Sequence, residues 1–346
     1  MPGMRKLLNT LYITSPESYL ARDGENVVVR VADTEKFRIP VHNIEGIVCF
    51  GYPGASPSLM GLCAERNVGL CFLTENGHFW GRFSGPVKGN VLLRRMQYRM
   101  ADDVDAALEI SRLIVAGKIA NCRNVLQRAI RDHGNEVISG PLSEASEILE
   151  IRQKQALRAI DPDTLRGIEG DSANAYFKVF NHLIVAQKDD FVFNGRSRRP
   201  PKDKVNALLS FVYTLLAHEV QSALESVGLD PYIGFLHTAR PGRASLALDL
   251  MEELRPYLAD RLVLSIINRK QINIKGFRER EESGVIMDDE TRKEVIGVWQ
   301  RRKQEEIQHP FLKEQIPVGL LPYAQALLFS RFIRGDIDKY PVFIMK

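Results

Sequence analysis

The sequence has few cysteines, and their spacing matches neither a metal site nor a disulfide framework. Four occur among 346 residues, and no two form a CxxC pair. Sparse, unpaired cysteines of this kind are typical of reduced and partly buried thiols in a cytosolic protein. The four residues are Cys49, Cys63, Cys71 and Cys122. Structural zinc and stabilisation by disulfides are therefore not expected.

Long apolar runs, a signal peptide, internal repeats and an extreme of charge are also missing. The richest apolar stretch, Leu208–Leu216, contains Ser and Tyr and is followed by His218 and Glu219. It is much shorter than the roughly 20 residues that span a bilayer. Leu7 and Leu8 are followed at once by Asn9, which is not the pattern of a signal peptide. The net charge of +4 permits a nucleic-acid partner without arguing for one. We expect a cytoplasmic protein with no membrane segment.

The first ninety residues have the pattern of a β-rich domain. Short stretches rich in β-branched and aromatic residues alternate with turn signals, Asp23-Gly24 and Asn76-Gly77 among them. Ser56 followed by Pro57 marks the start of one short helix. The expected strands are Thr10–Ile13, Val27–Val31, Phe37–Val41, Gly46–Phe50 and Gly69–Leu73. Residues 1–90 are therefore predicted to form a small sandwich or folded sheet with one helix.

From residue 91 onwards, apolar residues recur at helical spacing. One helix is expected to follow Asp203 as its N-cap and to end before Gly228, and another to cover Leu246–Leu262. A chain of this length usually forms two domains. The predicted fold class is therefore α+β, with a β-rich domain at residues 1–90 and a larger, mostly helical domain at residues 91–346.

Two segments gather acidic and imidazole side chains among glycines and apolar residues. The helix expected after residue 245 carries Asp249 and Glu252, which lie three residues apart and so leave the same face. A carboxylate close to packed apolar surface is costly unless a positive group compensates it. The alternative is a partly exposed helix face, with Arg255 as the compensating charge.

Glu169 and His237 add to this set from two other places in the sequence. His237 lies in a loop rich in glycine and proline, where functional side chains are often placed. Glu169 stands between Gly167 and Gly170, where the backbone can approach a ligand, or else it is an N-terminal carboxylate of a helix over residues 171–180. Together the carboxylates and the imidazole form a mixed oxygen and nitrogen site suited to Mg²⁺ or Mn²⁺. Such an ion would act on a phosphodiester.

Basic residues supply candidate contacts to phosphate. Arg240 and Arg243 lie within six residues of His237, and guanidinium groups match phosphate oxygens. A second basic segment is either a phosphate-binding arm or a solvated loop. Its members are Arg196, Arg198, Arg199, Lys202 and Lys204.

Long motifs extend these observations over nearly the whole chain. They are LRGIEGDSANAYF (Leu165–Phe177), RRPPKDKVNALLSFVYTLL (Arg198–Leu216) and LDPYIGFLHTARPGRASLALDLMEELRP (Leu229–Pro256), with LYITSPESYLARDGENVVV (Leu11–Val29) and RGDIDKYPVF (Arg334–Phe343) near the two ends. In these motifs the chain resembles the CRISPR-associated integrase, the universal spacer-acquisition protein of CRISPR antiviral defence.

The resemblance implies a fold, partners and a site. It implies a β domain that dimerises, an α domain that carries a divalent metal, a homodimer, and a small ferredoxin-like partner subunit that joins it. It assigns the metal ligands to Glu169, His237 and Glu252, with Asp249 as the acidic residue one turn earlier. Some relatives have Asp where this chain has Glu252, which leaves the adjacent Glu253 as an alternative ligand; Glu252 shares a face with Asp249 more closely.

Three functions follow as hypotheses. The first is a metal-dependent DNA nuclease and integrase, in which the 3′-hydroxyl of a short DNA fragment attacks a phosphodiester of a CRISPR array in double-stranded DNA. The second is a structure-specific nuclease that acts on branched repair intermediates. The third is a DNA-binding scaffold without catalysis, although clustered carboxylates repel phosphate and so disfavour it.

Overall fold

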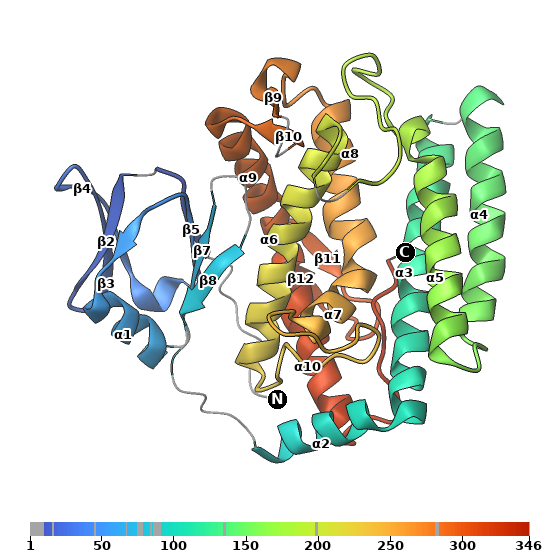
Figure 1. The fold of residues 1–346 in the computed structure, drawn as a ribbon, viewed down its shortest axis with the longest axis horizontal. Coiled ribbons are helices and arrows are strands. Elements are labelled where there is room, and N and C mark those ends of the chain that lie inside the picture. The colour runs from blue at the N-terminus through green and yellow to red at the C-terminus, as the bar shows by residue number, and fades with distance from the viewer. Residues whose placement is uncertain are drawn as a thin grey trace. The chain divides into compact units, whose positions relative to one another are not determined.

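The chain forms two compact units, Met1–Gly89 and Asn90–Lys346. The computed structural model describes residues 10–15, 17–44, 46–66, 68–74, 79–83, 85, 91–133, 136–197, 200–280 and 284–345. Figure 1 shows strands in the first unit and mainly helices in the second. This arrangement confirms the predicted α+β class, with a strand-rich N-terminal region followed by a larger helical region.

Unit 1 contains two four-stranded sheets and helix α1. One sheet has the order β1-β5-β7-β8, with β8 antiparallel to β7 and the other neighbours parallel. The second has the order β4-β3-β2-β6, with β6 parallel to β2 and the other pairs antiparallel. The elements are β1 (Thr10–Ile13), β2 (Ser18–Asp23), β3 (Asn26–Val31), β4 (Thr34–Pro40), η1 (Val41–Asn43), β5 (Gly46–Phe50), β6 (Gly54–Ala55), α1 (Pro57–Arg66), β7 (Gly69–Leu73) and β8 (Phe79–Phe83).

Both sheets and α1 contribute to one apolar core in unit 1. Leu20, Val27, Ile47 and Leu62 from four of these elements are fully buried in it. The expected cap of α1 is present, because Ser56 Oγ accepts a hydrogen bond from the backbone N–H of Leu59 at 3.2 Å. Strand β2 was not expected, and the Asp23-Gly24 turn joins it to β3. The Asn76-Gly77 turn lies outside the described residues.

Unit 2 is built mainly from helices, with two small hairpins. Asp203 caps α6 as predicted, its carboxylate accepting from the backbone N–H of Asn206 at 2.7 Å. Gly228 follows α6 in the left-handed region, with φ of 88°. The elements are α2 (Val91–Asp102), α3 (Val104–His133), α4 (Glu136–Ala156), α5 (Pro162–Lys178), η2 (Phe180–Leu183), α6 (Lys204–Ser226), α7 (Ser245–Arg255), η3 (Pro256–Asp260), α8 (Arg261–Asn268), η4 (Ile274–Gly276), β9 (Phe277–Arg280), β10 (Gly284–Met287), α9 (Asp289–Gln304), β11 (Glu306–Gln308), β12 (Gln315–Pro317), η5 (Val318–Leu320) and α10 (Leu321–Ile333).

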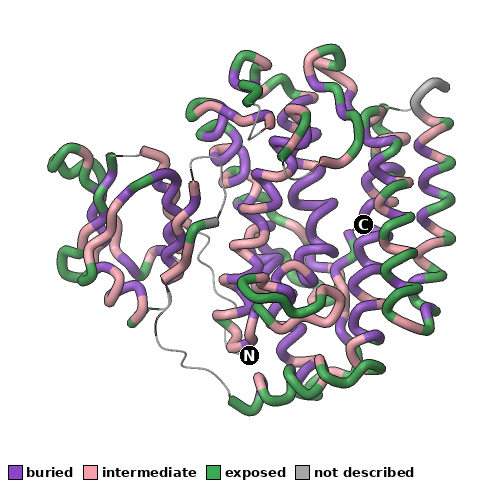
Figure 2. Tube along the Cα trace, viewed as in Figure 1, coloured by how far each residue is buried: buried purple, intermediate pink, exposed green. Residues whose placement is uncertain are grey.

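Helix α3 is the central support of the site in unit 2. It packs against α4 and α5 on one side and against α7 on another, while α6 packs against α7. The middle of α3 and nearly all of α7 are buried (Figure 2). Polar side chains on these helices therefore lie inside the unit, where each must find a partner.

Helix α6 has the extent predicted from Asp203 and Gly228, and it is apolar over most of its length. By length and composition alone it could cross a membrane, but 67% of its most apolar window is buried inside the unit. Burial of this extent is what the core helix of a globular unit shows, because its apolar side chains are already covered by protein.

Two helices differ from the sequence prediction in ways that affect the site. Helix α5 begins at Pro162, well before residue 171, because Asp161 caps it through the backbone N–H of Thr164 at 2.8 Å. Glu169 therefore lies inside a helix and not at its N-terminus. The predicted helix Leu246–Leu262 is α7 followed by a π-helical turn, η3, and then α8. A π-helical turn shifts the face on which the following side chains emerge.

Candidate active site

The acidic residues singled out from the sequence come from helices that pack on α3. Glu169 lies on α5 and Glu252 on α7, while the loop before α7 carries His237. A fourth residue joins them, Lys118 in the buried middle of α3. The site therefore draws on four segments that are far apart in the sequence.

Lys118 connects the two glutamates. Its ammonium forms an ion pair with Glu169 Oε1 and lies 2.8 Å from Glu252 Oε2. The side chains of Lys118 and Glu252 are 5% and 7% exposed, whereas that of Glu169 is 30% exposed. The two carboxylates thus share one buried cation, and Glu169 is the member of this cluster whose side chain is partly exposed to solvent.

Glu252 is held ionised in spite of its burial. Desolvation alone would raise its pKa, but the charges of Arg255 and Lys118 outweigh this effect and lower the pKa from 4.5 to about 2. Arg255 donates to Glu252 Oε1 at 3.1 Å and is itself buried. His237 contacts the preceding turn of the same helix, since its Nδ1 lies 2.6 Å from Asp249, three residues before Glu252.

Asp249 organises the loop that carries the histidine. Its fully buried carboxylate accepts hydrogen bonds from the backbone N–H groups of Phe235, Leu236 and His237 at 2.6, 3.0 and 2.9 Å. It also lies 2.6 Å from His237 Nδ1. A carboxylate at Nδ1 fixes the orientation of the ring and directs Nε2 outward as the remaining donor or ligand atom.

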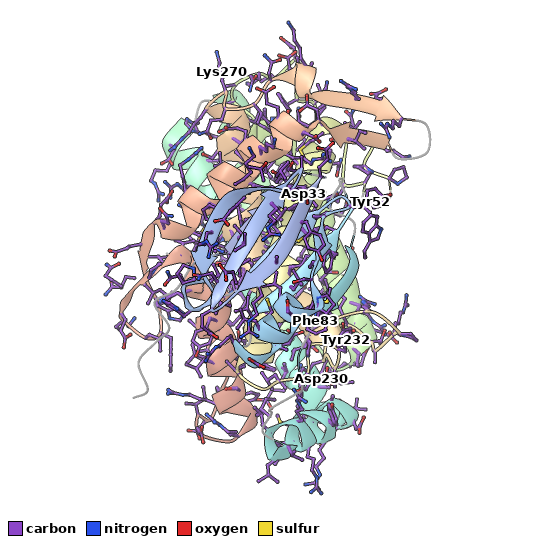
Figure 3. All side chains as sticks on the ribbon, turned by 90° about the vertical axis from the view of Figure 1, so that its left-hand side faces the viewer. Asp33, Tyr52, Phe83, Asp230, Tyr232 and Lys270 are labelled. Carbon is purple, nitrogen blue, oxygen red and sulfur yellow. The ribbon has the colours of Figure 1, made fainter. Side chains whose placement is uncertain are left out.

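The start of the same loop is anchored on α2. The side chain of Gln97, fully buried, donates to the carbonyl oxygens of Asp230 and Ile233 and accepts from the backbone N–H of Asp230. Tyr98 donates to the Asp230 carboxylate at 2.7 Å. Figure 3 shows Asp230 beside α2, and the Asp230 carboxylate also accepts from the backbone N–H of Tyr232 at 2.9 Å. The loop is therefore fixed at both ends, by α2 and by Asp249.

Glu253 is distinct from this group. Its carboxylate accepts hydrogen bonds from Tyr340, Gln325 and the backbone N–H of Phe343, so it fastens the C-terminal segment to α7. Burial raises its pKa to about 7 in spite of these donors. Between the two neighbouring glutamates, Glu252 is the one that contacts Lys118.

A buried polar network behind Glu252 was not predicted. Arg255 lies over the ring of Tyr213, with 4.9 Å between the guanidinium carbon and the ring centroid. The hydroxyls of Tyr213 and Tyr176 both donate to Asp260 on the π-helical turn. Burial raises the pKa of both tyrosines and of Asp260. The network holds Arg255 in place and so supports Glu252.

The sequence did contain one signal for Lys118. It is the sole charged residue between Arg112 and Arg123, in the run LIVAGKIANC, at a position that helical periodicity assigns to the buried face. A lysine at such a position requires a carboxylate partner. Tyr213 and Asp260 carried no comparable signal, because their pairing depends on how α5, α6 and η3 pack.

The predicted phosphate contacts divide into two groups. Arg240 is exposed and Arg243 is half-buried on the loop that carries His237, and Lys202 is exposed. Arg196 instead donates to Asn206 Oδ1 at 2.7 Å and lies over Tyr213 at 5.2 Å, so its side chain is committed to the interior. Arg198 and Arg199 lie outside the described residues.

The donor set is suited to a hard divalent ion, although the side chains are not arranged around one. Among the described residues, no group of three or more His, Cys, Asp or Glu side chains is positioned to hold a metal directly. Glu252 Oε2 is nevertheless buried and accepts no hydrogen bond in this part of the chain, since the contact of 2.8 Å with Lys118 lacks hydrogen-bond angles. A buried carboxylate oxygen whose neighbour is a cation fits the role of a metal ligand.

The buried cysteines show no sign of chemistry. All four are free thiols, and burial raises the pKa values of Cys49, Cys63 and Cys122. A thiol with a raised pKa is a poor nucleophile and a poor metal ligand. The acidic and imidazole side chains thus remain the candidate active site.

We compared the sequence and structure of this chain with those of known proteins. The family model described as CRISPR associated protein Cas1 matches residues 11–301. A CRISPR-associated endonuclease Cas1 of Chlorobaculum tepidum is 53% identical, with 99% of this chain and 100% of that relative covered. A second, from Rhodospirillum rubrum, is 49% identical, with the same coverage. The structure of a Cas1 protein from Thermotoga maritima superposes with a TM-score of 0.79 at 25% identity, covering 98% of this chain and 100% of that one.

Proposed function

The chain belongs to the Cas1 family of CRISPR-associated proteins, and we propose that it is a divalent-metal-dependent DNA endonuclease and integrase of CRISPR adaptation. In this function it inserts short DNA fragments into a CRISPR array, in the cytoplasm, through attack of a fragment 3′-hydroxyl on a phosphodiester. The endonuclease part is supported by the two relatives at 53% and 49% identity, both named as endonucleases. The observation that carries the proposal is the pairing of Glu169 and Glu252 on Lys118, with His237 held by Asp249 on the helix that carries Glu252.

Glu169, Glu252 and His237 Nε2 are the groups that would hold Mg²⁺ or Mn²⁺. Two carboxylates and one imidazole suit these ions, and the buried Oε2 of Glu252, which already faces the ammonium of Lys118, supports the assignment. When bound, the ion would polarise the scissile phosphodiester and stabilise the attacking and leaving oxygens.

The residues around these groups prepare them for that role. Arg255 and Lys118 keep Glu252 anionic, so it is available as a ligand at any pH well above 2. Asp249 holds His237 through Nδ1 and through the backbone of its loop. Nε2 has no hydrogen-bond partner among the described residues, and the loop is too well anchored for the ring to turn freely.

Phosphate contacts are proposed for the basic residues nearest His237. Arg240 and Arg243 lie three and six residues after it and are exposed or half-exposed. Lys202 is a further candidate, and so are Arg198 and Arg199. Arg196 is better explained as a support of Tyr213 and Asn206. A homodimer formed through unit 1 and a small ferredoxin-like partner subunit complete the proposal; the family resemblance supports both.

One reaction separates this function from its alternatives. The protein is incubated with a labelled duplex that has free 3′ ends and with a supercoiled plasmid carrying a CRISPR array, in Mn²⁺ or in chelator. Joining of label to the array in Mn²⁺ alone supports the integrase. Cleavage of branched DNA without joining would favour a repair nuclease, and binding that survives chelation without any reaction would favour a scaffold.

Matched variants connect the reaction to the site. Glu252→Gln removes the proposed ligand charge while keeping its size, and should abolish joining. Glu294→Gln makes the same change at an exposed glutamate that pairs with Arg301 on α9, and should leave joining unchanged. Equal activity in both variants would remove Glu252 from the chemistry.

A further inference from the structure

One ammonium group holds two carboxylates that come from different helices. Lys118 on α3 contacts Glu169 of α5 and Glu252 of α7. Both glutamates are proposed metal ligands, so this inference rests on the proposed function. It concerns how these ligands are held before a metal arrives.

A cation that binds both glutamates has little choice of position. Lys118 Nζ already lies in contact with both Glu169 Oε1 and Glu252 Oε2. A divalent ion held by the same two oxygens must occupy the same region, and two cations at contact distance repel each other strongly in a buried site. Binding of the ion therefore requires the ammonium to leave.

The two cations that contact Glu252 differ in their ability to move. Arg255 is bound to the other oxygen, Oε1, and its planar guanidinium lies over Tyr213, which is in turn bonded to Asp260. Lys118 has a flexible four-carbon stem and a compact charge. Its contacts at the site are ion pairs with the two glutamates that a metal would also bind. Arg255 is therefore expected to remain bound to Glu252 when a metal binds, whereas Lys118 is the cation that can be displaced.

We propose that Lys118 is a positioning residue that holds Glu169 and Glu252 together in the metal-free protein and gives up its place to the divalent ion. The lysine serves as an internal counter-ion. It prevents two carboxylates, one of them buried, from repelling each other and from being left unpaired. Metal binding exchanges this internal cation for an external one.

The test measures Mn²⁺ affinity directly, without reference to DNA cleavage. Lys118→Met replaces the lysine by an apolar side chain of similar length, and isothermal titration gives the affinity of the full chain for Mn²⁺. In the variant, Mn²⁺ no longer competes with an ammonium group for the two glutamates. The affinity of the variant for Mn²⁺ should therefore be about tenfold higher than that of the wild type, as expected for removing one like charge within about 4–6 Å. Lys303→Met is the matched control, since Lys303 is equally buried and pairs with Glu219 at 2.6 Å away from the glutamate pair. Its Mn²⁺ affinity should equal that of the wild type.

A second readout is thermal stability in chelator. Lys118→Met should unfold at lower temperature than the wild type in chelator, and Mn²⁺ should raise its unfolding temperature by more than that of the wild type. Adding Glu169→Gln to Lys118→Met removes one of the repelling charges and should recover part of the loss in chelator. These differences separate a counter-ion from a lysine that merely fills space.

Further variants keep the proposal testable if Lys118→Met does not fold. Lys118→Gln is neutral but polar and should show the same gain in Mn²⁺ affinity, whereas Lys118→Arg keeps the charge and should not. Affinity in the neutral variants that equals or falls below the wild-type value overturns the proposal while leaving the proposed function intact. If the wild type itself binds no Mn²⁺, both the proposal and the metal-dependent function are wrong.

Discussion

Replacing Arg255 by leucine is the perturbation that most sharply tests how the site is held together. Arg255 is buried, donates to Glu252 Oε1 at 3.1 Å and lies over Tyr213 at 4.9 Å. Arg255→Leu leaves Glu252 in the interior with Lys118 as its remaining cation. The variant therefore removes half of the charge compensation and keeps most of the packing volume.

The expected loss of stability follows from these contacts. The pKa of Glu252, lowered from 4.5 to about 2, corresponds to about 3 kcal/mol of stabilisation of its ionised form. Breaking a buried ion pair by removing one partner typically costs about 3–5 kcal/mol. The contact with the Tyr213 ring adds about 1 kcal/mol. We expect Arg255→Leu to lower the free energy of unfolding of unit 2 by about 4 kcal/mol near pH 7.

The pH dependence gives the sign of the effect. Because the folded-state pKa of Glu252 lies below its ordinary value, its ionised form stabilises the protein above pH 4.5, and this stabilisation is lost as the pH falls towards 2. Arg255→Leu raises the folded-state pKa of Glu252. The difference in stability between variant and wild type should therefore shrink as the pH falls below about 4.5.

Urea unfolding monitored by tryptophan fluorescence measures this loss in unit 2. The chain has two tryptophans, and Trp299 is buried in unit 2 with its Nε1 bonded to Glu219. In a Trp80→Phe background the signal comes from Trp299 alone. Arg301→Leu, which breaks an exposed pair with Glu294, is the control and should cost no more than about 1 kcal/mol.

A double-mutant cycle decides whether the charges are coupled. The combined loss in Arg255→Leu with Glu252→Gln should be smaller than the sum of the two single losses by about 2 kcal/mol or more, because the glutamine leaves no uncompensated charge. Additivity within about 0.5 kcal/mol would refute the reasoning. Arg255 would then be a packing residue and not the counter-ion of Glu252.

The remaining predictions concern the C-terminal segment, the histidine loop and the DNA contacts. Burial raises the pKa of Glu253 to about 7, so stability should fall as the pH rises from 4.5 through 7, and Glu253→Gln should flatten this fall in unfolding measured from pH 5 to 8. Asp249→Asn replaces an acceptor of three backbone N–H groups by a side chain with one acceptor oxygen; it should reduce Mn²⁺ affinity about tenfold or more by calorimetry, and unchanged affinity would show that the loop holds His237 without it. DNA affinity measured by fluorescence anisotropy should fall steeply with salt, and replacing Arg240 and Arg243 together by glutamine should weaken binding and flatten that salt dependence, whereas an unaltered slope would remove them from the interface.

The overall architecture could be predicted from the sequence because its signals are local. Asp203 and Gly228 mark the ends of α6 through capping and a left-handed backbone, and Ser56 marks the start of α1. Strand patterns located β1, β5 and β7 for the same reason. Strand β2 was missed because Ser18–Asp23 mixes polar and apolar residues, and its pairing with β3 stabilises it.

The site was less predictable than the fold because its contacts join residues that are far apart in the sequence and meet only when the helices pack together. The position of Glu169 within α5 depends on the cap at Asp161, which lies outside the motif that drew attention to it. Lys118 meets Glu169 and Glu252 only when α3, α5 and α7 pack together. Sequence spacing placed Asp249 and Glu252 on one side of a helix. It did not predict that Asp249 holds the His237 loop while Glu252 contacts Lys118.

The most direct test of the central claim is a crystal structure of the protein soaked with Mn²⁺, with the ion located by its anomalous scattering. The account predicts one strong peak in unit 2 within coordination distance of carboxylate oxygens of Glu169 and Glu252 and of His237 Nε2, with Lys118 Nζ moved away from both glutamates. A peak elsewhere, or a lysine that still bridges Glu169 and Glu252 while Mn²⁺ is bound to the protein, would contradict it.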